Sequence, residues 1–117
     1  IVLIYVSSPY VVRGVSPDFS ALKKFKRHAY IVTAKGDGAY DFTSRFFAPG
    51  FGIDEDPVTG GAHCVLAGYW QERLGKDSFL AYQASPRGGV LKVQAAAPRC
   101  YLSGQAVTVL RGELVAR

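Results

Sequence analysis

The stretch DEDPVTGGAHCVLAGYW, residues 54–70, decides the fold that this sequence predicts. Three acids, a proline and a glycine pair precede a run that is apolar on nearly every side until Gln71. A helix that is hydrophobic all round must be surrounded by protein. We therefore predict a buried central helix over residues 60–74, followed by Gly75 as its C′ residue.

The segments before this helix predict a strand, a helix and a hairpin. Residues 1–6, IVLIYV, are rich in β-branched side chains and predict a buried strand. Residues 16–28 predict a helix with Ser16 as its N-cap and Pro17 at its first position. Residues 30–48 contain two apolar runs around a glycine-rich turn and predict a hairpin.

Short apolar runs that alternate with turn residues follow the helix and predict further strands. The order strand, helix, hairpin, buried helix, strands indicates one α+β domain over residues 1–117. We expect a curved, mostly antiparallel sheet wrapped around the one central helix. Three or four downstream strands are expected, in SFLAYQA (78–84), GVLKVQA (89–95), RCYLSG (99–104) and AVTVLRGELV (106–115).

The composition is that of a globular protein, with 49% hydrophobic and 20% charged residues. No apolar run approaches the ~20 residues that cross a membrane, and the first residues lack the basic flank of a signal peptide. We therefore expect a cytoplasmic protein. The net charge of +5 comes partly from KKFKRH, residues 23–28. We interpret this run as a solvated helix face rather than a nucleic-acid site, and the excess positive charge would suit an anionic substrate.

Two residue types add information on the compartment and on the extent of the chain. Cys64 and Cys100 form no C-x-x-C pair, and we predict a buried Cys64, no disulfide framework and no catalytic thiol. The sequence contains no methionine and begins with Ile1, so we expect further residues upstream in the natural protein.

The corner before the central helix allows two capping patterns. Asp56 is the N-cap if Pro57 is the first helical residue, and Thr59 is the N-cap if Gly60 and Gly61 fill the first turn. Each glycine costs roughly 1 kcal/mol against alanine within a helix. A turn explains the glycines most simply. We favour the alternative that the backbone approaches an anion there, because free amides at a helix N-terminus bind negative charge.

The same residues carry a family resemblance. The segment RFFAPGFGIDEDPVTGGAHCVLAGYW (45–70) resembles the signature R-x-F-x-P…GI-x-EDP-x-TG-S/G-A-H of the PhzF-like, or phenazine biosynthesis-like, proteins. YQASPRGG (82–89) is similar to a glycine-rich segment further along in that family. The resemblance implies the diaminopimelate epimerase fold, with two similar lobes around one active site. It also implies isomerase chemistry, namely proton transfer on a small carboxylic acid without a cofactor or metal.

By the same resemblance, Asp56 is the aspartate at the substrate that assists binding or proton movement. The backbone amides of Gly60, Gly61 and Ala62 form the substrate cradle, and Gly61 replaces a serine found in many relatives. His63 matches a histidine present in part of the family. We expect it to be hydrogen-bonded near the helix start, more readily than to transfer protons.

Arg45 matches the arginine of R-x-F-x-P, and for it we prefer a salt bridge with Asp54, Glu55 or Asp56 over substrate binding. The chain resembles only the C-terminal half of the family, and the family's usual catalytic glutamate has no counterpart here, so whether the chain is an active enzyme stays open. Glu55 is the only nearby carboxylate that could replace it.

The expected partners are a small carboxylate or another anionic metabolite and a missing N-terminal lobe. Two alternatives remain. In the first, two copies of the chain pair as a homodimer, as the two lobes do in the complete family members. In the second, the chain is a non-catalytic interaction module that kept the fold. We expect no nucleic acid and no membrane as partner.

Overall fold

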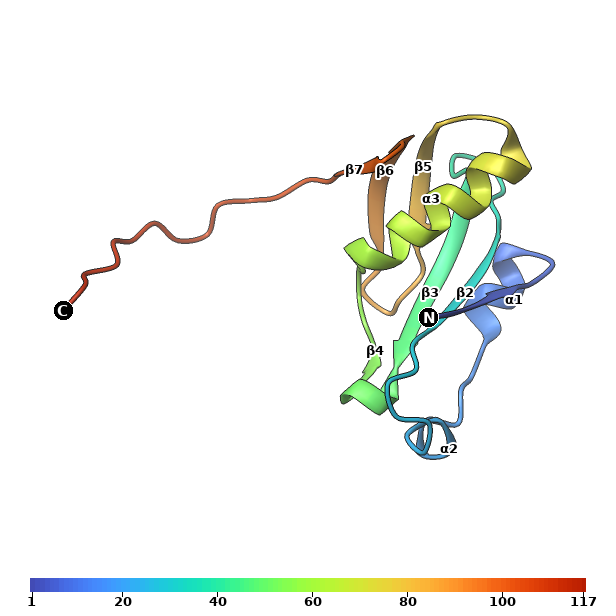
Figure 1. Cartoon of the computed structure of the whole chain (residues 1–117), viewed down its shortest axis with the longest axis horizontal. Coiled ribbons are helices and arrows are strands. Elements are labelled where there is room, and N and C mark those ends of the chain that lie inside the picture. Colours follow the sequence, from blue (N-terminus) through green and yellow to red (C-terminus); the bar gives the residue numbers. More distant parts are fainter.

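A mixed sheet forms the centre of the computed structural model, which describes all 117 residues. Its strands lie in the order β1-β2-β3-β5-β6-β7, and β4 pairs with the C-terminal end of β3 (Figure 1). The pairs β1–β2 and β3–β5 are parallel, and the other four pairs are antiparallel. The strands are β1 (Val2–Tyr5), β2 (Tyr30–Lys35), β3 (Phe42–Ala48), β4 (Ile53–Glu55), β5 (Ser78–Gln83), β6 (Gly89–Ala96) and β7 (Arg99–Ser103).

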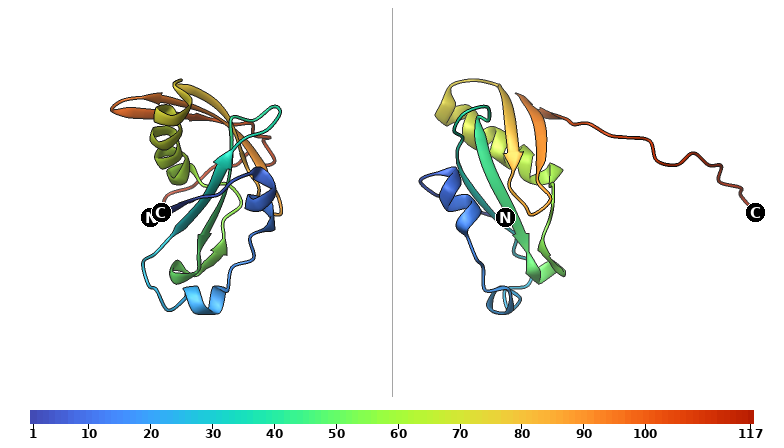
Figure 2. Two further views of the ribbon diagram at one scale, coloured as in Figure 1. Left: turned by 90° about the vertical axis from the view of Figure 1, so that its right-hand side faces the viewer. Right: turned by 180° about the vertical axis from the view of Figure 1, so that it is seen from behind.

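Helices lie on both faces of the sheet (Figure 2). The long helix α3 (Gly60–Leu74) packs on one face, where Leu66 and Trp70 join a core with strand residues such as Ile31. The short helix α1 (Pro9–Gly14) packs on the other face. There the second core cluster contains Val12, Val32, Ala34 and Phe47. The first half of the sheet is therefore covered on both sides, which explains why β2 is buried at four successive residues.

The predicted hairpin and the bounds of the central helix are confirmed. β2 and β3 pair antiparallel over residues 30–47, and α3 spans residues 60–74. Gly75 ends α3 in the left-handed conformation, with φ of 64°, where glycine carries no steric cost. None of the helices combines the length and the apolar composition that crossing a membrane requires.

The environment of α3 differs from the prediction of a fully surrounded helix. Trp70 is buried, as expected, but Cys64, Val65 and Gly68 are exposed. The prediction of a buried Cys64 was therefore wrong. One face of α3 packs on the sheet, and no element of the chain covers the opposite face. The exposed face of α3 thus carries apolar residues that the packing of this chain alone does not require.

Two predictions for the first 28 residues were also wrong. The segment expected to be a buried strand is the edge strand β1, with three of its four residues exposed. The helix expected over residues 16–28 is reduced to α2 (Phe19–Leu22). Its N-cap is Asp18, whose side chain accepts a hydrogen bond from the amide of Ala21 at 2.9 Å, and not Ser16.

The fourth downstream strand is absent. From Gly104 onward the chain leaves β7 as an extended segment without regular structure (Figure 1). Its large apolar side chains, Val107, Val109, Leu110, Leu114 and Val115, are at least 83% exposed. The alternating pattern of this segment predicted a strand, but no strand of this chain pairs with it. Between β3 and α3 the chain forms the 3₁₀ helix η1 (Pro49–Phe51) and the strand β4.

Candidate functional site

Thr59, rather than Asp56, is the N-cap of α3. Its side chain makes no capping hydrogen bond to the helix. The hydroxyl Oγ1 instead donates to Oδ2 of Asp56 at 2.5 Å. A Thr N-cap normally satisfies one of the unpaired amides of the first turn, so this diversion leaves those amides without a side-chain partner.

A buried glutamine holds the loop in this arrangement. Gln83, at the end of β5, is fully buried, and its side-chain oxygen accepts a hydrogen bond from the amide of Thr59 at 2.8 Å. Its side-chain nitrogen donates to the carbonyl of Asp56 at 2.8 Å and to Oγ1 of Thr59 at 3.1 Å. Because Oγ1 accepts from Gln83, its own hydrogen is directed to the Asp56 carboxylate.

Ser85 supports the same loop from the β5–β6 turn. Its hydroxyl donates to the carbonyl of Pro57 at 2.8 Å and accepts from the amide of Gly88 at 3.0 Å. Gly88 itself has φ of 71°, which glycine adopts without strain. Neither Gln83 nor Ser85 was predicted as a site residue, although both lie in the YQASPRGG segment. Their roles depend on contacts across 24 to 28 residues, which only the fold reveals.

The tip of α3 is open. Gly60 and Gly61 are exposed, and a Cβ added at Gly61 would meet no atom within 4 Å. At Gly60 the same Cβ would meet only the side chain of Leu102, at 3.5 Å. The N–H groups of the first turn, including that of the buried Ala62, have no intrahelical acceptor. The partial positive charge of the helix end is therefore presented at an accessible surface.

His63 lies beside the tip but faces the core. Its side chain is fully buried against the ring of Phe42, and Nδ1 donates to the carbonyl of Thr59 at 2.7 Å. The predicted hydrogen bond near the helix start is confirmed. Nε2 has no hydrogen-bond partner. Burial lowers the pKa of His63, and the bond to Thr59 opposes that shift only in part, so the environment favours the neutral ring.

Arg45 forms the predicted salt bridge, and its partner is Glu55. Nε and Nη2 of Arg45 donate to the two carboxylate oxygens at 2.7 and 2.9 Å. Nη1 donates to the carbonyl of Val15 at 2.7 Å, at the end of α1. Arg45 thus ties α1 to β3 and β4. Both groups are engaged, so Arg45 is not available for a substrate at the α3 tip, and Glu55 is a poor candidate for a free base.

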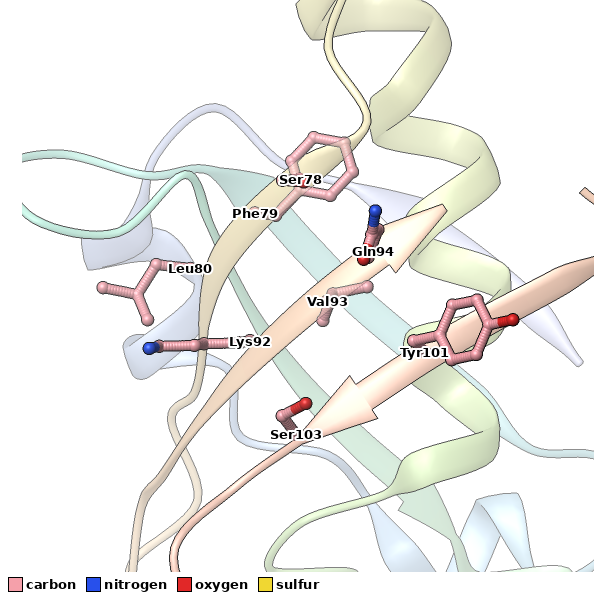
Figure 3. A pocket seen from close by; sticks show the side chains of 8 residues that line it. All are labelled: Ser78, Phe79, Leu80, Lys92, Val93, Gln94, Tyr101 and Ser103. Carbon is pink, nitrogen blue, oxygen red and sulfur yellow. The ribbon is translucent and has the colours of Figure 1, made fainter. Parts of the chain in front are cut away.

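Two hollows on the surface of the chain do not include Asp56 or residues 60–63. One, of about 500 Å³, lies on β5, β6 and β7 (Figure 3). Among its lining residues Lys92 is the only charged one. The other, of about 340 Å³, lies between α3 and the β6–β7 turn. The exposed glycines show that the α3 tip is an open surface in this chain. No group of three or more potential ligands is placed to hold a metal ion.

Comparison with known proteins gives consistent results. Residues 1–112 match the family model described as phenazine biosynthesis-like protein, PhzC-PhzF. An uncharacterized isomerase of Halalkalibacterium halodurans is 52% identical over 114 residues, which cover 97% of this chain and 43% of that protein. An uncharacterized isomerase of Pseudomonas aeruginosa is 47% identical over 112 residues, covering 96% of this chain and 42% of that protein.

Solved structures agree in fold. The crystal structure of a PhzC/PhzF protein from Clostridium difficile superposes with a TM-score of 0.84 at 35% identity, covering 97% of this chain and 44% of that one. A PhzF-family structure from Enterococcus faecalis gives a TM-score of 0.76 at 39% identity, with 91% and 44% covered. The chain thus spans less than half the length of these relatives.

Proposed function

Because this chain belongs to the phenazine biosynthesis-like protein family, we propose that it supplies the anion-binding lobe of an isomerase that moves a proton on a small carboxylic acid. The relatives named isomerases support the reaction class. The observation that carries the proposal for this chain is the uncapped, open tip of α3 beside the Asp56 carboxylate. No cofactor or metal takes part in the proposed reaction.

The helix tip contributes binding and charge stabilisation. The amides of Gly60, Gly61 and Ala62 would donate to the substrate carboxylate. Negative charge develops when a proton is removed next to a carboxylate, and fixed donors stabilise that charge without having to reorganise. The glycines leave room for the ligand, because no side chain of this chain fills the space at Gly61.

Asp56 is the proposed proton carrier at this site. Thr59 donates to Oδ2, which fixes the carboxylate at the helix tip, and Oδ1 is without a hydrogen-bond partner. A carboxylate held in this way can accept or return a proton on a bound ligand. His63 is placed to position the helix start through Thr59 rather than to touch the substrate.

A second lobe would supply the main base. Glu55, the only nearby substitute, is bound at both oxygens by Arg45. The chain alone would then bind the anion without turning it over. The exposed face of α3, with Val65, provides a surface for such a lobe.

The test is a titration of the chain with inorganic phosphate and with acetate, followed by amide resonances. We expect shifts at residues 60–62. Gly60→Pro removes one donor while suiting the first helical position, and Gly60→Ala retains that donor and serves as the matched control. Binding weakens in Gly60→Pro and persists in Gly60→Ala. If neither anion moves these resonances in the unmodified chain, the proposed cradle is wrong.

The exposed α3 face supports a second candidate function, a stand-alone lobe that pairs with another copy through this face. Val65 is 41% exposed there and has no partner element in the chain. Sedimentation equilibrium distinguishes the two cases. Self-association that Val65→Glu abolishes would favour the homodimer or interaction module, and a monomer at high concentration would exclude it.

A further inference from the structure

The two cysteines, separated by a long stretch of sequence, lie on neighbouring elements. Cys64 belongs to the second turn of α3, and Cys100 belongs to β7, paired with Ala95 of β6. Both line the hollow of about 340 Å³ between the helix and the β6–β7 turn. The remaining lining residues include Ala67 and Gly68, which offer little or no side chain to fill the hollow.

The two thiols share this hollow, and the charge of Cys64 affects Cys100. Burial raises the pKa of Cys100, and the charge of Cys64 raises it further. Cys64 is exposed, whereas Cys100 is half-buried. A reagent from solution therefore reaches Cys64 first, and Cys100 is the adjacent thiol that can respond.

We propose that Cys64 and Cys100 are a redox-modification site that forms a reversible disulfide within one chain when it meets a low-molecular-weight disulfide such as oxidised glutathione. The Cys64 thiolate attacks one sulfur of the reagent, which forms a mixed disulfide and releases one glutathione thiolate. The Cys100 thiolate then attacks the Cys64 sulfur and releases the second glutathione. Two electrons pass from the cysteine pair to the reagent, and the two cysteine protons end on the two glutathione molecules.

The disulfide would join the second turn of α3 to the last strand of the sheet. In the reduced chain these elements meet through side-chain packing, in which Cys100 and Leu102 lie against the main core cluster. The expectation of no disulfide framework is compatible with this proposal, since a reversible pair is not needed for folding. A cross-link also reduces the freedom of the unfolded chain, so oxidation would raise the melting temperature.

The experiment treats the reduced 117-residue chain with oxidised glutathione and quenches it with an alkylating reagent. Intact mass then distinguishes the products. We expect a monomer lighter by two hydrogen atoms, and a tryptic product that links residues 46–73 to residues 100–111. Dithiothreitol should restore the original mass and the lower melting temperature.

Two single substitutions serve as matched controls. Cys100→Ser should retain glutathione on Cys64, because the attacking thiol is gone. Cys64→Ser should react more slowly, because the remaining thiol is half-buried. If the unmodified chain keeps stable glutathione adducts, or forms only dimers linked between chains, the proposed intrachain disulfide is wrong.

Discussion

The side-chain oxygen of Gln83 accepts the backbone N–H of Thr59 at 2.8 Å, 24 residues away in the sequence. This bond and the two that the same side chain donates fix the loop before α3. They determine which residue caps the helix and where the Asp56 carboxylate lies. The geometry of the candidate site thus depends on a residue of the sheet outside the loop itself.

Replacing Gln83 with leucine should therefore destabilise the chain. The change leaves the amide of Thr59 and the carbonyl of Asp56 without partners, at a cost of about 1–3 kcal/mol. Gln94→Leu, on the exposed face of β6, is the matched control and should stay within about 0.5 kcal/mol. Urea unfolding measures both. Equal effects of the two substitutions would contradict the role of Gln83.

Arg45→Ala should lower the free energy of unfolding by more, because it leaves the largely buried Glu55 without its cation. The two side chains are 11% and 13% exposed, and breaking a buried pair costs about 3–5 kcal/mol. The carbonyl of Val15 also loses its donor. The neighbouring pair of Lys23 and Asp54, at 3.5 Å, is about half exposed and serves as the control.

Lys23→Ala should change the free energy of unfolding by about 0–1 kcal/mol. Arg45→Lys should restore only part of the loss, since lysine cannot make the two parallel bonds. An Arg45→Ala variant as stable as Lys23→Ala would show that the α1–β3–β4 connection does not depend on this pair.

His63 should give the chain a dependence of stability on pH. Its pKa in the folded state is lowered from 6.5. As the pH falls below 6.5, the histidine of the unfolded chain binds a proton that the folded chain does not bind. The free energy of unfolding therefore falls. The loss ends once the pH has passed the lowered folded-state pKa. Above pH 6.5 the histidine contributes no slope.

The measurement is the free energy of unfolding between about pH 5 and 8, where histidine titrates. His63→Gln should remove the slope that begins at the unfolded-state pKa. His28→Gln, the substitution of the only other histidine, which is exposed, should retain it. An unchanged slope in His63→Gln would assign the dependence to other groups.

Substitution by alanine at two glycines, Gly68 and Gly36, should change the stability of the chain in opposite directions. Gly68 lies on the exposed face of α3, and an added Cβ would meet no atom within 4 Å. Gly68→Ala should stabilise the chain by about 0.5–1 kcal/mol through helix propensity. At Gly36 the added Cβ would overlap the backbone carbonyl of Tyr40. Gly36→Ala should therefore destabilise, and thermal melts of the two variants distinguish the signs.

The sequence predicted those parts of the fold that local patterns specify. The length of α3 and its end at Gly75 follow from composition and from a residue that tolerates positive φ. The choice between Asp56 and Thr59 as cap could not be made, because both residue types suit the position. A contact with distant Gln83 decides it.

Elsewhere the same helix-start pattern, a serine followed by a proline, occurs twice. Only the structure shows which of the two begins a helix. Ser8-Pro9 and Ser16-Pro17 both have the form of a helix start. Ser8 is a true N-cap whose hydroxyl accepts from Val11 at 3.2 Å, whereas Asp18 caps the helix expected at Ser16. The burial of β1 was mispredicted for a related reason. Apolar residues indicate a strand, but whether another layer covers it depends on the rest of the assembly.

The extended segment after Ser103 has a consequence for how the molecule behaves in solution. The radius of gyration is 15.8 Å, against about 13 Å for a compact domain of this length. Trypsin should cut first after Arg111, in backbone that no strand protects. The trimmed body should keep its melting temperature while sedimenting as a rounder particle, since the removed residues stabilise nothing that remains.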